Sequence, residues 1–471
     1  MAAPATDAAA APGIRGFVLA HRTGVIVGAS ALAFALLVTG ALYAGAAVGS
    51  RNATVNSDGE VVLDSARPKP AEIADPSRLR TCSVATLAED PRLVGLTGAV
   101  TNATTGAVLF DRGAATASRQ AGASKVLTGA AAITILGADA TLSTKVYEGS
   151  SPKTIVLVGG GDPTLTNLES GDSVYAGAPR LSTLADKVLD AYDDDIENIV
   201  LDASLWSQGD KWDSTWPRSA QTGGTMSEVT ALQVDGDREN PREQISPRST
   251  DPVARAGVLF ARALGLDPDD VTFSLGSAVP SKPVLAEVTS QPISVLVTQM
   301  LMQNDNTLAE SLARLISKKS NSGGTAASIS QSITSALAVH AVPATGVVLH
   351  DGSGLSTATV IPPKFLADFM AKVHAGSNEL NLIYNSLPVA GKSGTLAARF
   401  TGDSAAAKNQ VIALAGASGG YSLAGVVLAV DGTPLSFSFA ATGDGVKDNA
   451  RAALDALATG VFACGDNLSN N

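Results

Sequence analysis

The sequence is poor in the side chains that bind metals or build disulfide-rich domains. It has only two cysteines, Cys82 and Cys464. Two thiols alone cannot build a tetrahedral metal site. The four histidines are scattered without ligand spacing: His21, His340, His350 and His374. We therefore expect no metal and no other cofactor.

Aromatic residues make up only 4% of the chain, and positive charge is in deficit, because the net charge is -11. No basic stripe is present that would neutralise phosphates, so the composition argues against a nucleic-acid partner. We attribute the acidity to solubility. With 471 residues, 45% of them hydrophobic, the chain is long enough for two or three domains and a large core.

Charge is also absent from one long stretch, residues 24–50. About 20 apolar residues span a bilayer, so this stretch predicts a single transmembrane anchor. Arg15 and Arg22 precede it, which favours a cytoplasmic N-terminus and a body outside the cell membrane. A cleaved signal peptide is the alternative, and it exports the body as well. In an oxidising compartment Cys82 and Cys464 can form a disulfide; otherwise they are two buried thiols.

Patterning along the chain predicts an α+β protein with an inserted α/β subdomain. Val100–Arg112 is typical of a hairpin, and Ser124–Gly137 of a buried helix that ends at a glycine. Helical spacing returns at Ile293–Arg314. The predicted parts are a cytoplasmic tail (1–23), the anchor (24–50), a polar linker (51–80), one domain in two segments (81–140 and 286–465), the inserted subdomain (141–285) and a C-terminal tail (466–471).

Two short motifs suggest other chemistry and fail on their neighbours. Ser386–Ser393 approaches a phosphate-binding loop, but serine replaces the first glycine and Pro388 removes a backbone N–H. Gly416–Gly420 fits the GxSxG pattern of α/β-hydrolases, which place their histidine after the serine. This chain has no histidine beyond His374.

Several separated stretches, in one order, resemble the serine D-Ala-D-Ala carboxypeptidase/endopeptidase family of penicillin-binding proteins. The stretches are 109–112, 125–132, 156–165, 231–238, 251–254, 304–310, 351–356 and 387–396. The resemblance runs from about Cys82 to Cys464. It implies a penicillin-binding-protein/β-lactamase-like transpeptidase fold, in which helices flank an antiparallel sheet and a subdomain is inserted between the first two of three catalytic boxes.

Those boxes are SxxK, SxN and KTG. A serine at a helix N-terminus attacks the substrate carbonyl, and the lysine one turn later takes its proton. The second box relays a proton, and the third offers a cation and a hydroxyl to the substrate carboxylate. The family therefore needs all three boxes for turnover.

This sequence departs from the family in each box. With Lys125 aligned to the box lysine, Gly122 stands at the nucleophile position. The second box reads Asn304-Asp305-Asn306, which replaces the first hydroxyl by an amide. At the third box, Leu414, Ala415 and Gly416 stand where Lys-Thr-Gly is expected. Lys125 and Asn306 remain, and we expect them to form a buried hydrogen-bonded pair.

The sequence thus predicts a membrane-anchored, extracytoplasmic homologue of the family that no longer turns over substrate. The resemblance implies a role in peptidoglycan assembly, through binding of stem peptides or of a cell-wall enzyme. The alternative is an active D-Ala-D-Ala carboxypeptidase with a rearranged site, in which Lys392-Ser393-Gly394 acts as the third box. A third hypothesis is an unrelated serine hydrolase built on Ser418.

Overall fold

The computed structural model describes residues 53–55, 61–63, 80–207 and 209–469. The chain divides into two units, residues 1–78 and 79–471. In the first unit, β1 (Ala53–Val55) pairs with β2 (Val61–Leu63) in antiparallel fashion, inside the predicted linker. Both segments are rich in β-branched residues, which favour strands. The predicted anchor, residues 24–50, lies outside the described residues, and none of the described helices is long and apolar enough to cross a bilayer.

The second unit contains a five-stranded antiparallel sheet that joins the two ends of the body. Its strand order is β10-β11-β12-β3-β4. The strands are β10 (Val411–Gly416), β11 (Tyr421–Leu428), β12 (Pro434–Ala441), β3 (Leu96–Asn102) and β4 (Val108–Arg112). Strands β3 and β4 form the predicted hairpin, and β12 pairs with β3 although more than three hundred residues separate them in sequence. The first sheet therefore unites both segments of the predicted domain.

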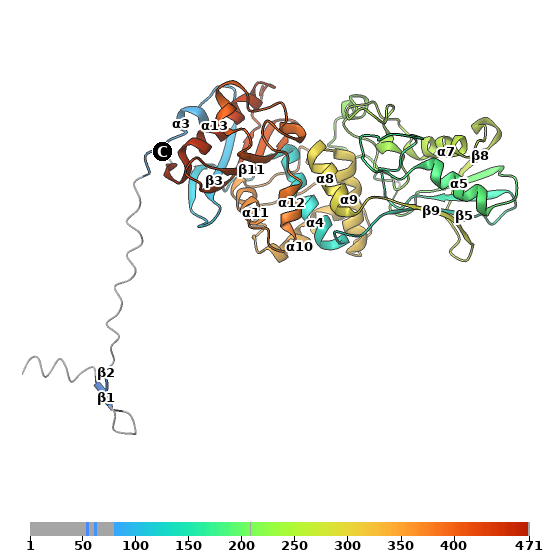
Figure 1. The fold of residues 1–471 in the computed structure, drawn as a ribbon, viewed down its shortest axis with the longest axis horizontal. Helices are drawn as coiled ribbons and strands as arrows, with labels where there is room; N and C mark the ends of the chain where they lie inside the picture. The colour runs from blue at the N-terminus through green and yellow to red at the C-terminus, as the bar shows by residue number, and fades with distance from the viewer. Residues whose placement is uncertain (1–52, 56–60, 64–79, 208, 470–471) are drawn as a thin grey trace, which may run out of the picture. The chain divides into compact units, whose positions relative to one another are not determined.

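Helices cover both faces of this sheet (Figure 1). Along β12, Leu435, Phe437 and Phe439 pack into a core beneath α13 (Ala450–Cys464). The residues between them are small, and that opposite face lies against α11 (Pro363–Ala375). The alternation of large and small residues along one strand thus fixes which helix lies on which face.

A second five-stranded sheet occupies the region predicted as the insertion, residues 141–285, and its last strand extends beyond that region to residue 289. Its order is β8-β7-β6-β5-β9, and it is mixed: β6, β7 and β8 run parallel, while β5 is antiparallel to both neighbours. The strands are β5 (Ser143–Glu148), β6 (Thr154–Val158), β7 (Asn198–Asp202), β8 (Thr272–Leu275) and β9 (Val284–Thr289). Helices α5 (Leu181–Ala191) and α7 (Pro252–Ala263) pack against it.

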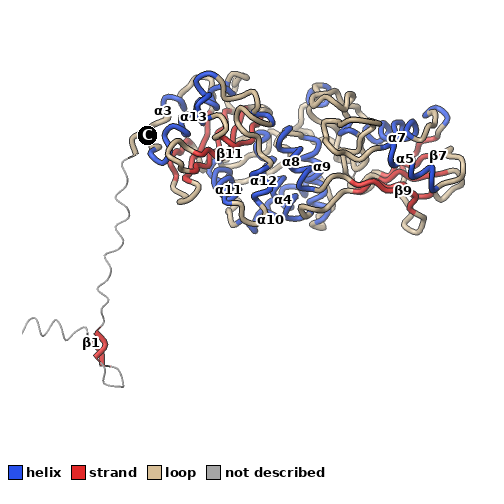
Figure 2. The backbone as a smooth tube through the Cα atoms, in the orientation of Figure 1, coloured by secondary structure: helices blue, strands red, loops and turns tan. Residues whose placement is uncertain are grey.

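A helical layer lies between the two sheets (Figure 2). It contains α4 (Lys125–Leu136), α8 (Ile293–Gln303), α9 (Asn306–Lys319) and α10 (Ile329–Leu337). Helix α4 is the predicted buried helix, and it ends at Gly137, whose φ of +92° suits glycine. The predicted helical stretch Ile293–Arg314 is divided into α8 and α9 at Asn304 and Asp305.

Smaller helices complete the body. They are α3 (Ala85–Ala88), α6 (Ser219–Thr222) and α12 (Leu380–Asn385). Near the ends of the body, Cys82 and Cys464 form a disulfide. Cys82 also forms a parallel bridge with Leu468, which brings the first and last described segments of this unit together. The disulfide that the two cysteines allowed is therefore confirmed.

Candidate ligand site

The site begins at the N-terminus of α4. A 3-10 turn, Ala121–Ser124, leads into the helix and carries Gly122. Lys125 opens α4 and is fully buried. Its Nζ donates to Asn306 Oδ1 at 2.6 Å and to the carbonyl oxygen of Ser353 at 2.8 Å. The lysine and the asparagine therefore form the buried pair that the sequence predicted.

Burial governs the charges around this pair. It lowers the pKa of Lys125 to about 8, against the pull of the Asp351, Asp305 and Glu310 carboxylates. Burial also raises the pKa of Glu310 to about 8, and nearby Asp351 adds to that rise. Glu310 accepts a hydrogen bond from the Ser353 N–H at 2.6 Å. Lys125 thus contacts the backbone carbonyl of Ser353 and Glu310 contacts its backbone N–H, and Ser353 lies in the loop after α10.

The residues that the resemblance assigns to the second box lie at the break between α8 and α9. Asn304 ends α8 in the left-handed conformation, with φ of 53°, which asparagine tolerates better than most residues. Asp305 then caps α9 by accepting the Leu308 N–H at 2.9 Å. The short loop leaves the Asn304 and Asn306 side chains on the side of α4.

Asp305 also joins this loop to the inserted region. It forms a buried ion pair with Arg238 at 2.6 Å and accepts a hydrogen bond from the Tyr175 hydroxyl at 2.9 Å. Burial alone would raise the pKa of Asp305, but the guanidinium groups of Arg238 and Arg248 hold it well below its usual range.

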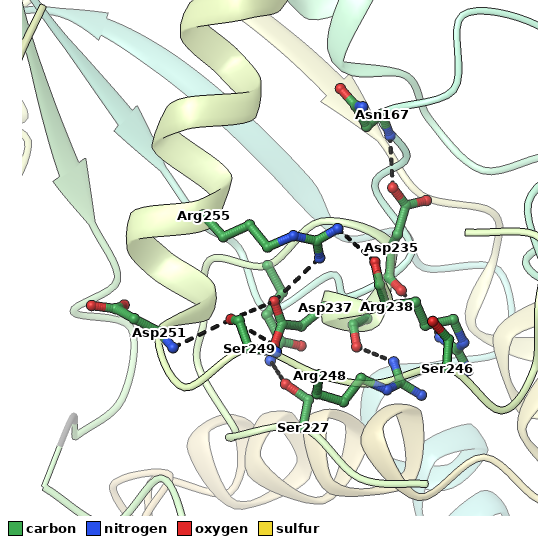
Figure 3. Close-up of polar contacts among 12 residues, drawn as sticks. Asn167, Ser227, Asp235, Asp237, Arg238, Ser246, Arg248, Ser249, Asp251 and Arg255 are labelled. Atoms are coloured by element: carbon green, nitrogen blue, oxygen red, sulfur yellow. Dashed lines mark hydrogen bonds and ion pairs between the residues drawn. The ribbon is translucent and has the colours of Figure 1, made fainter. Parts of the chain in front are cut away.

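Arg238 follows a tight turn in which Asp235, Gly236 and Asp237 all have positive φ. Figure 3 shows the polar contacts that hold this turn, including those of Asp237 with Ser249 and with Arg255. Each non-glycine residue in this conformation costs about 1 kcal/mol or more, so the surrounding contacts must hold the turn in place.

Strand β10 forms the third side of the site, after the N-terminus of α4 and the loop between α8 and α9. It is an edge strand, and the carbonyl oxygen of Ala415 accepts a hydrogen bond from Asn304 Nδ2 at 3.1 Å. Leu414 is buried in the core rather than exposed to the site. A Cβ on Gly416 would lie 2.4 Å from the Gly122 nitrogen, so only glycine fits where the strand passes the helix N-terminus.

These three sides enclose a cavity of about 560 Å³. Of the box positions, Gly122, Lys125, Asn304, Asn306, Ala415 and Gly416 line it. Leu414 does not belong to the lining. Thr395, from the family-like stretch 387–396, and Arg399, which follows that stretch, also line the cavity. The lining further includes residues from distant segments that the sequence did not single out: Gln244, Ile245, Arg248 and Arg451.

The Asn304 side chain lies against Gly122, the position that the resemblance assigns to the nucleophile. A Cβ built on Gly122 would lie 2.7 Å from Asn304 Oδ1 and 3.1 Å from its Nδ2. Real Cβ atoms essentially never come closer than 3.0 Å to another heavy atom. A side chain at this position would therefore require Asn304 to move.

Other serines are placed differently from a nucleophile. Ser124 is buried, donates to the Ala121 carbonyl at 3.2 Å and is not among the lining residues of the cavity. Ser418 lines the cavity but donates to the Leu355 carbonyl at 3.1 Å. It lies between the antiparallel strands β10 and β11, whereas the GxSxG motif of hydrolases needs a strand-to-helix turn.

The described residues contain no group of three or more His, Cys, Asp or Glu side chains arranged to hold a metal ion. The cavity therefore offers hydrogen-bond donors and positive charge rather than metal ligands. This arrangement can bind a ligand. Lys125 and Asn306 contribute polar side chains to the lining of the cavity.

The fold of the body is that of the penicillin-binding-protein/β-lactamase-like class. The solved structure of penicillin binding protein 4 from Haemophilus influenzae is similar, with a TM-score of 0.67 over 80% of this chain and 98% of that chain, at 19% identity. That similarity establishes the shared fold of the body, with its two sheets.

Sequence comparison gives the family. The family described as D-Ala-D-Ala carboxypeptidase 3 (S13) matches residues 81–244 and 228–461. The chain is 34% identical to Carboxypeptidase DacB of Mycolicibacterium smegmatis over 419 residues, which cover 86% of this chain and 88% of that protein. A carboxypeptidase of Mycobacterium tuberculosis is also 34% identical, over 394 residues. The chain therefore belongs to this carboxypeptidase family, as its sequence predicted.

Proposed function

We propose that this protein is a non-catalytic member of its family that binds peptidoglycan stem peptides and serves cell-wall assembly through that binding. The observation that carries the proposal is the pairing of Gly122 with Asn304. The family places its nucleophile where this chain has no side chain, and an amide fills the space beside it.

The remaining features of the cavity favour binding without acyl transfer. Lys125 donates to an amide and a carbonyl oxygen, not to a hydroxyl that it could activate. The loss of one member of such a catalytic group typically lowers the rate by several powers of ten. The size and polarity of the cavity suit a peptide with carboxylate groups.

The alternative of an active enzyme with a rearranged site finds little support in the geometry. Lys392, its proposed third-box cation, is exposed and is not among the lining residues of the cavity. Ser124, the serine next to Lys125 that such an enzyme could use as its nucleophile, is likewise not a lining residue.

The site of action belongs to the same proposal. We infer that residues 24–50 anchor the protein in the cell membrane, with the N-terminus in the cytoplasm and the body outside. The uncharged stretch and the preceding Arg15 and Arg22 support this topology. The Cys82–Cys464 disulfide supports export, because such bonds persist in oxidising compartments. The redox state of these cysteines in cells is therefore a direct measurement of export.

The catalytic question is settled by covalent labelling. The full chain in detergent is incubated with a fluorescent penicillin and, separately, with diacetyl-L-Lys-D-Ala-D-Ala. We expect no fluorescent band after denaturing electrophoresis and no released D-alanine. The related carboxypeptidase of Mycolicibacterium smegmatis, treated in parallel, serves as the comparison for both assays.

Three variants test which serine, if any, can react with the penicillin. In G122S the end of the Asn304 side chain must shift to admit the new side chain, so we expect less labelling of G122S than of G122S/N304S, which provides room for a serine beside Lys125. A covalent band on the unmodified chain, lost in S124A, would refute the non-catalytic assignment and establish the rearranged enzyme.

A further inference from the structure

The cavity is far more positive than the protein around it. Five of its described lining side chains are cations, Lys125, Arg238, Arg248, Arg399 and Arg451, whereas Asp305 is the single lining carboxylate. The whole chain has a net charge of -11. A cleft of one sign within a protein of the opposite sign concentrates ligands of matching charge, here anions.

Three of these cations already make hydrogen bonds or an ion pair within the protein. Lys125 donates to two oxygen atoms, as described above, and Arg238 is paired with Asp305. Arg248 donates to two backbone carbonyl oxygens, one of which is drawn in Figure 3. Each of the three is buried, so its removal would disturb packing before it could report on a ligand.

Arg451 differs from them in exposure and in pairing. Its side chain is 48% exposed, and its Nε lies 2.8 Å from an Asp448 carboxylate that is 76% exposed. Exposed pairs of this kind contribute little to stability. The guanidinium also lies over the Tyr421 ring, with its central carbon 5.3 Å from the ring centroid. The ring holds the cation at the cavity wall and leaves its terminal nitrogens available to a ligand.

The position of Arg451 in its helix is unfavourable for a purely structural role. It lies in the first turn of α13, where the helix dipole favours negative charge. Arg399 supports this turn: its Nη2 donates to the Arg451 carbonyl oxygen at 3.2 Å and pairs with Asp455 at 2.7 Å. A cation fixed at the unfavourable end of a helix, on the wall of a cavity, is suited to binding an anion.

We propose that Arg451, positioned by Arg399, binds the free C-terminal carboxylate of a stem peptide that ends in D-Ala-D-Ala. The resemblance assigns the third-box cation and hydroxyl to Leu414 and Ala415, which offer neither group, and Leu414 is buried in the core. The cations of the cavity wall outside β10 are therefore the candidates for carboxylate recognition. A guanidinium can hold a carboxylate through two parallel N–H···O bonds. This assignment rests on the proposed binding function and names the residue that gives it specificity.

The experiment compares the affinity of the protein for a peptide acid with its affinity for the corresponding uncharged amide. Diacetyl-L-Lys-D-Ala-D-Ala and its C-terminal amide are titrated calorimetrically into the full chain in detergent. The unmodified chain should bind the acid better than the amide. R451M should weaken binding of the acid about tenfold or more and leave the affinity for the amide unchanged, because a charge-assisted hydrogen bond is lost only with the acid.

R262M serves as the matched control. Arg262 is an exposed arginine in the last turn of α7, outside the cavity lining, so this variant removes the same charge from the same side-chain type elsewhere. We expect R262M to bind both peptides as the unmodified chain does. Both variants should keep the melting temperature of the unmodified chain.

The titrations distinguish a failure of the Arg451 assignment from a failure of the proposed function. If the unmodified chain binds the acid and R451M binds it equally well, the role of Arg451 is wrong and the proposed function stands. Equal losses for acid and amide, together with a lower melting temperature, would reassign Arg451 to a structural role and also overturn the inference. If the unmodified chain binds neither peptide, the proposed function itself fails.

Discussion

At the scale of single residues, the site places two ionisable side chains in the interior of the protein. Lys125 and Glu310 are both fully buried, and each contacts one side of Ser353. Two buried ionisable groups are costly unless their hydrogen bonds are made. Glu310 Oε2 has no partner among the described residues, so this carboxyl is the weaker member of the arrangement. Its titration should therefore be visible in the stability of the protein.

We predict that Glu310 lowers stability as the pH rises. Its pKa is about 8 in the folded chain and 4.5 ordinarily, so between these values the folded state binds the additional proton. Stability then falls with rising pH across that window. E310Q mimics the neutral carboxyl. At pH 5 its melting temperature should match that of the unmodified chain to within about 1 °C, and at pH 8 it should be higher by roughly 1–3 °C.

Thermal melts across pH 5 to 8 measure this difference. The groups that face Glu310 are Asp351, Arg314 and Lys125, and the pKa of Lys125 is itself near 8, so measurements stop at pH 8. If the two melting profiles run parallel, the buried carboxyl is not the group that titrates.

At the scale of elements, local patterning predicted most helices and strands but not the breaks that build the site. The alternation in Val100–Arg112 and the glycine after α4 were sufficient, because both are local signals. The division of Ile293–Arg314 at Asn304 was missed, although an asparagine that ends one helix and an aspartate that caps the next were visible in the sequence. That division brings Asn304 to the space beside Gly122.

Asp305 gives a prediction at this scale, because it caps α9 and also neutralises Arg238. D305N can still accept the Leu308 N–H but leaves a buried guanidinium without its carboxylate. We expect it to lower the free energy of unfolding by about 3–5 kcal/mol. D251N is the matched control, since Asp251 caps α7 from an exposed position. Its cost should stay below about 1 kcal/mol, because an asparagine caps nearly as well as an aspartate.

Urea unfolding of the two variants separates capping from charge. A large loss in D305N alone attributes the stability to the buried ion pair that joins the second box to the inserted region. Similar small losses in both variants would mean that Arg238 finds another way to be neutralised.

At the scale of the whole molecule, the resemblance to the carboxypeptidase family indicated which distant residues belong to one site, which local sequence patterns could not do. The order of similar stretches placed Gly122, Asn304 and Ala415 in corresponding boxes, and the structure places all three around one cavity. Neither route found Arg451, because no local pattern connects a residue in the last helix to the N-terminus of α4. Contacts between such distant segments depend on how the sheet and the helical layer assemble, which a single sequence does not encode in any short window.

A single disulfide joins the first and last segments of the body. Cys82 and Cys464 are separated by 382 positions. A disulfide typically contributes roughly 2–4 kcal/mol to stability. C82S/C464S should therefore melt several degrees below the oxidised chain. The proposed export predicts that, in cells, the full chain resists thiol alkylation until it is reduced.

A chain that lacks residues 1–50 and remains in the cytoplasm supplies the contrast. Its thiols should be alkylated without reduction, it should melt like C82S/C464S, and oxidation after purification should restore the higher melting temperature. Free thiols in the full chain from intact cells would refute export. Equal melting of oxidised and serine-substituted chains would instead mean that the core beneath α13 holds the two ends together without the bond.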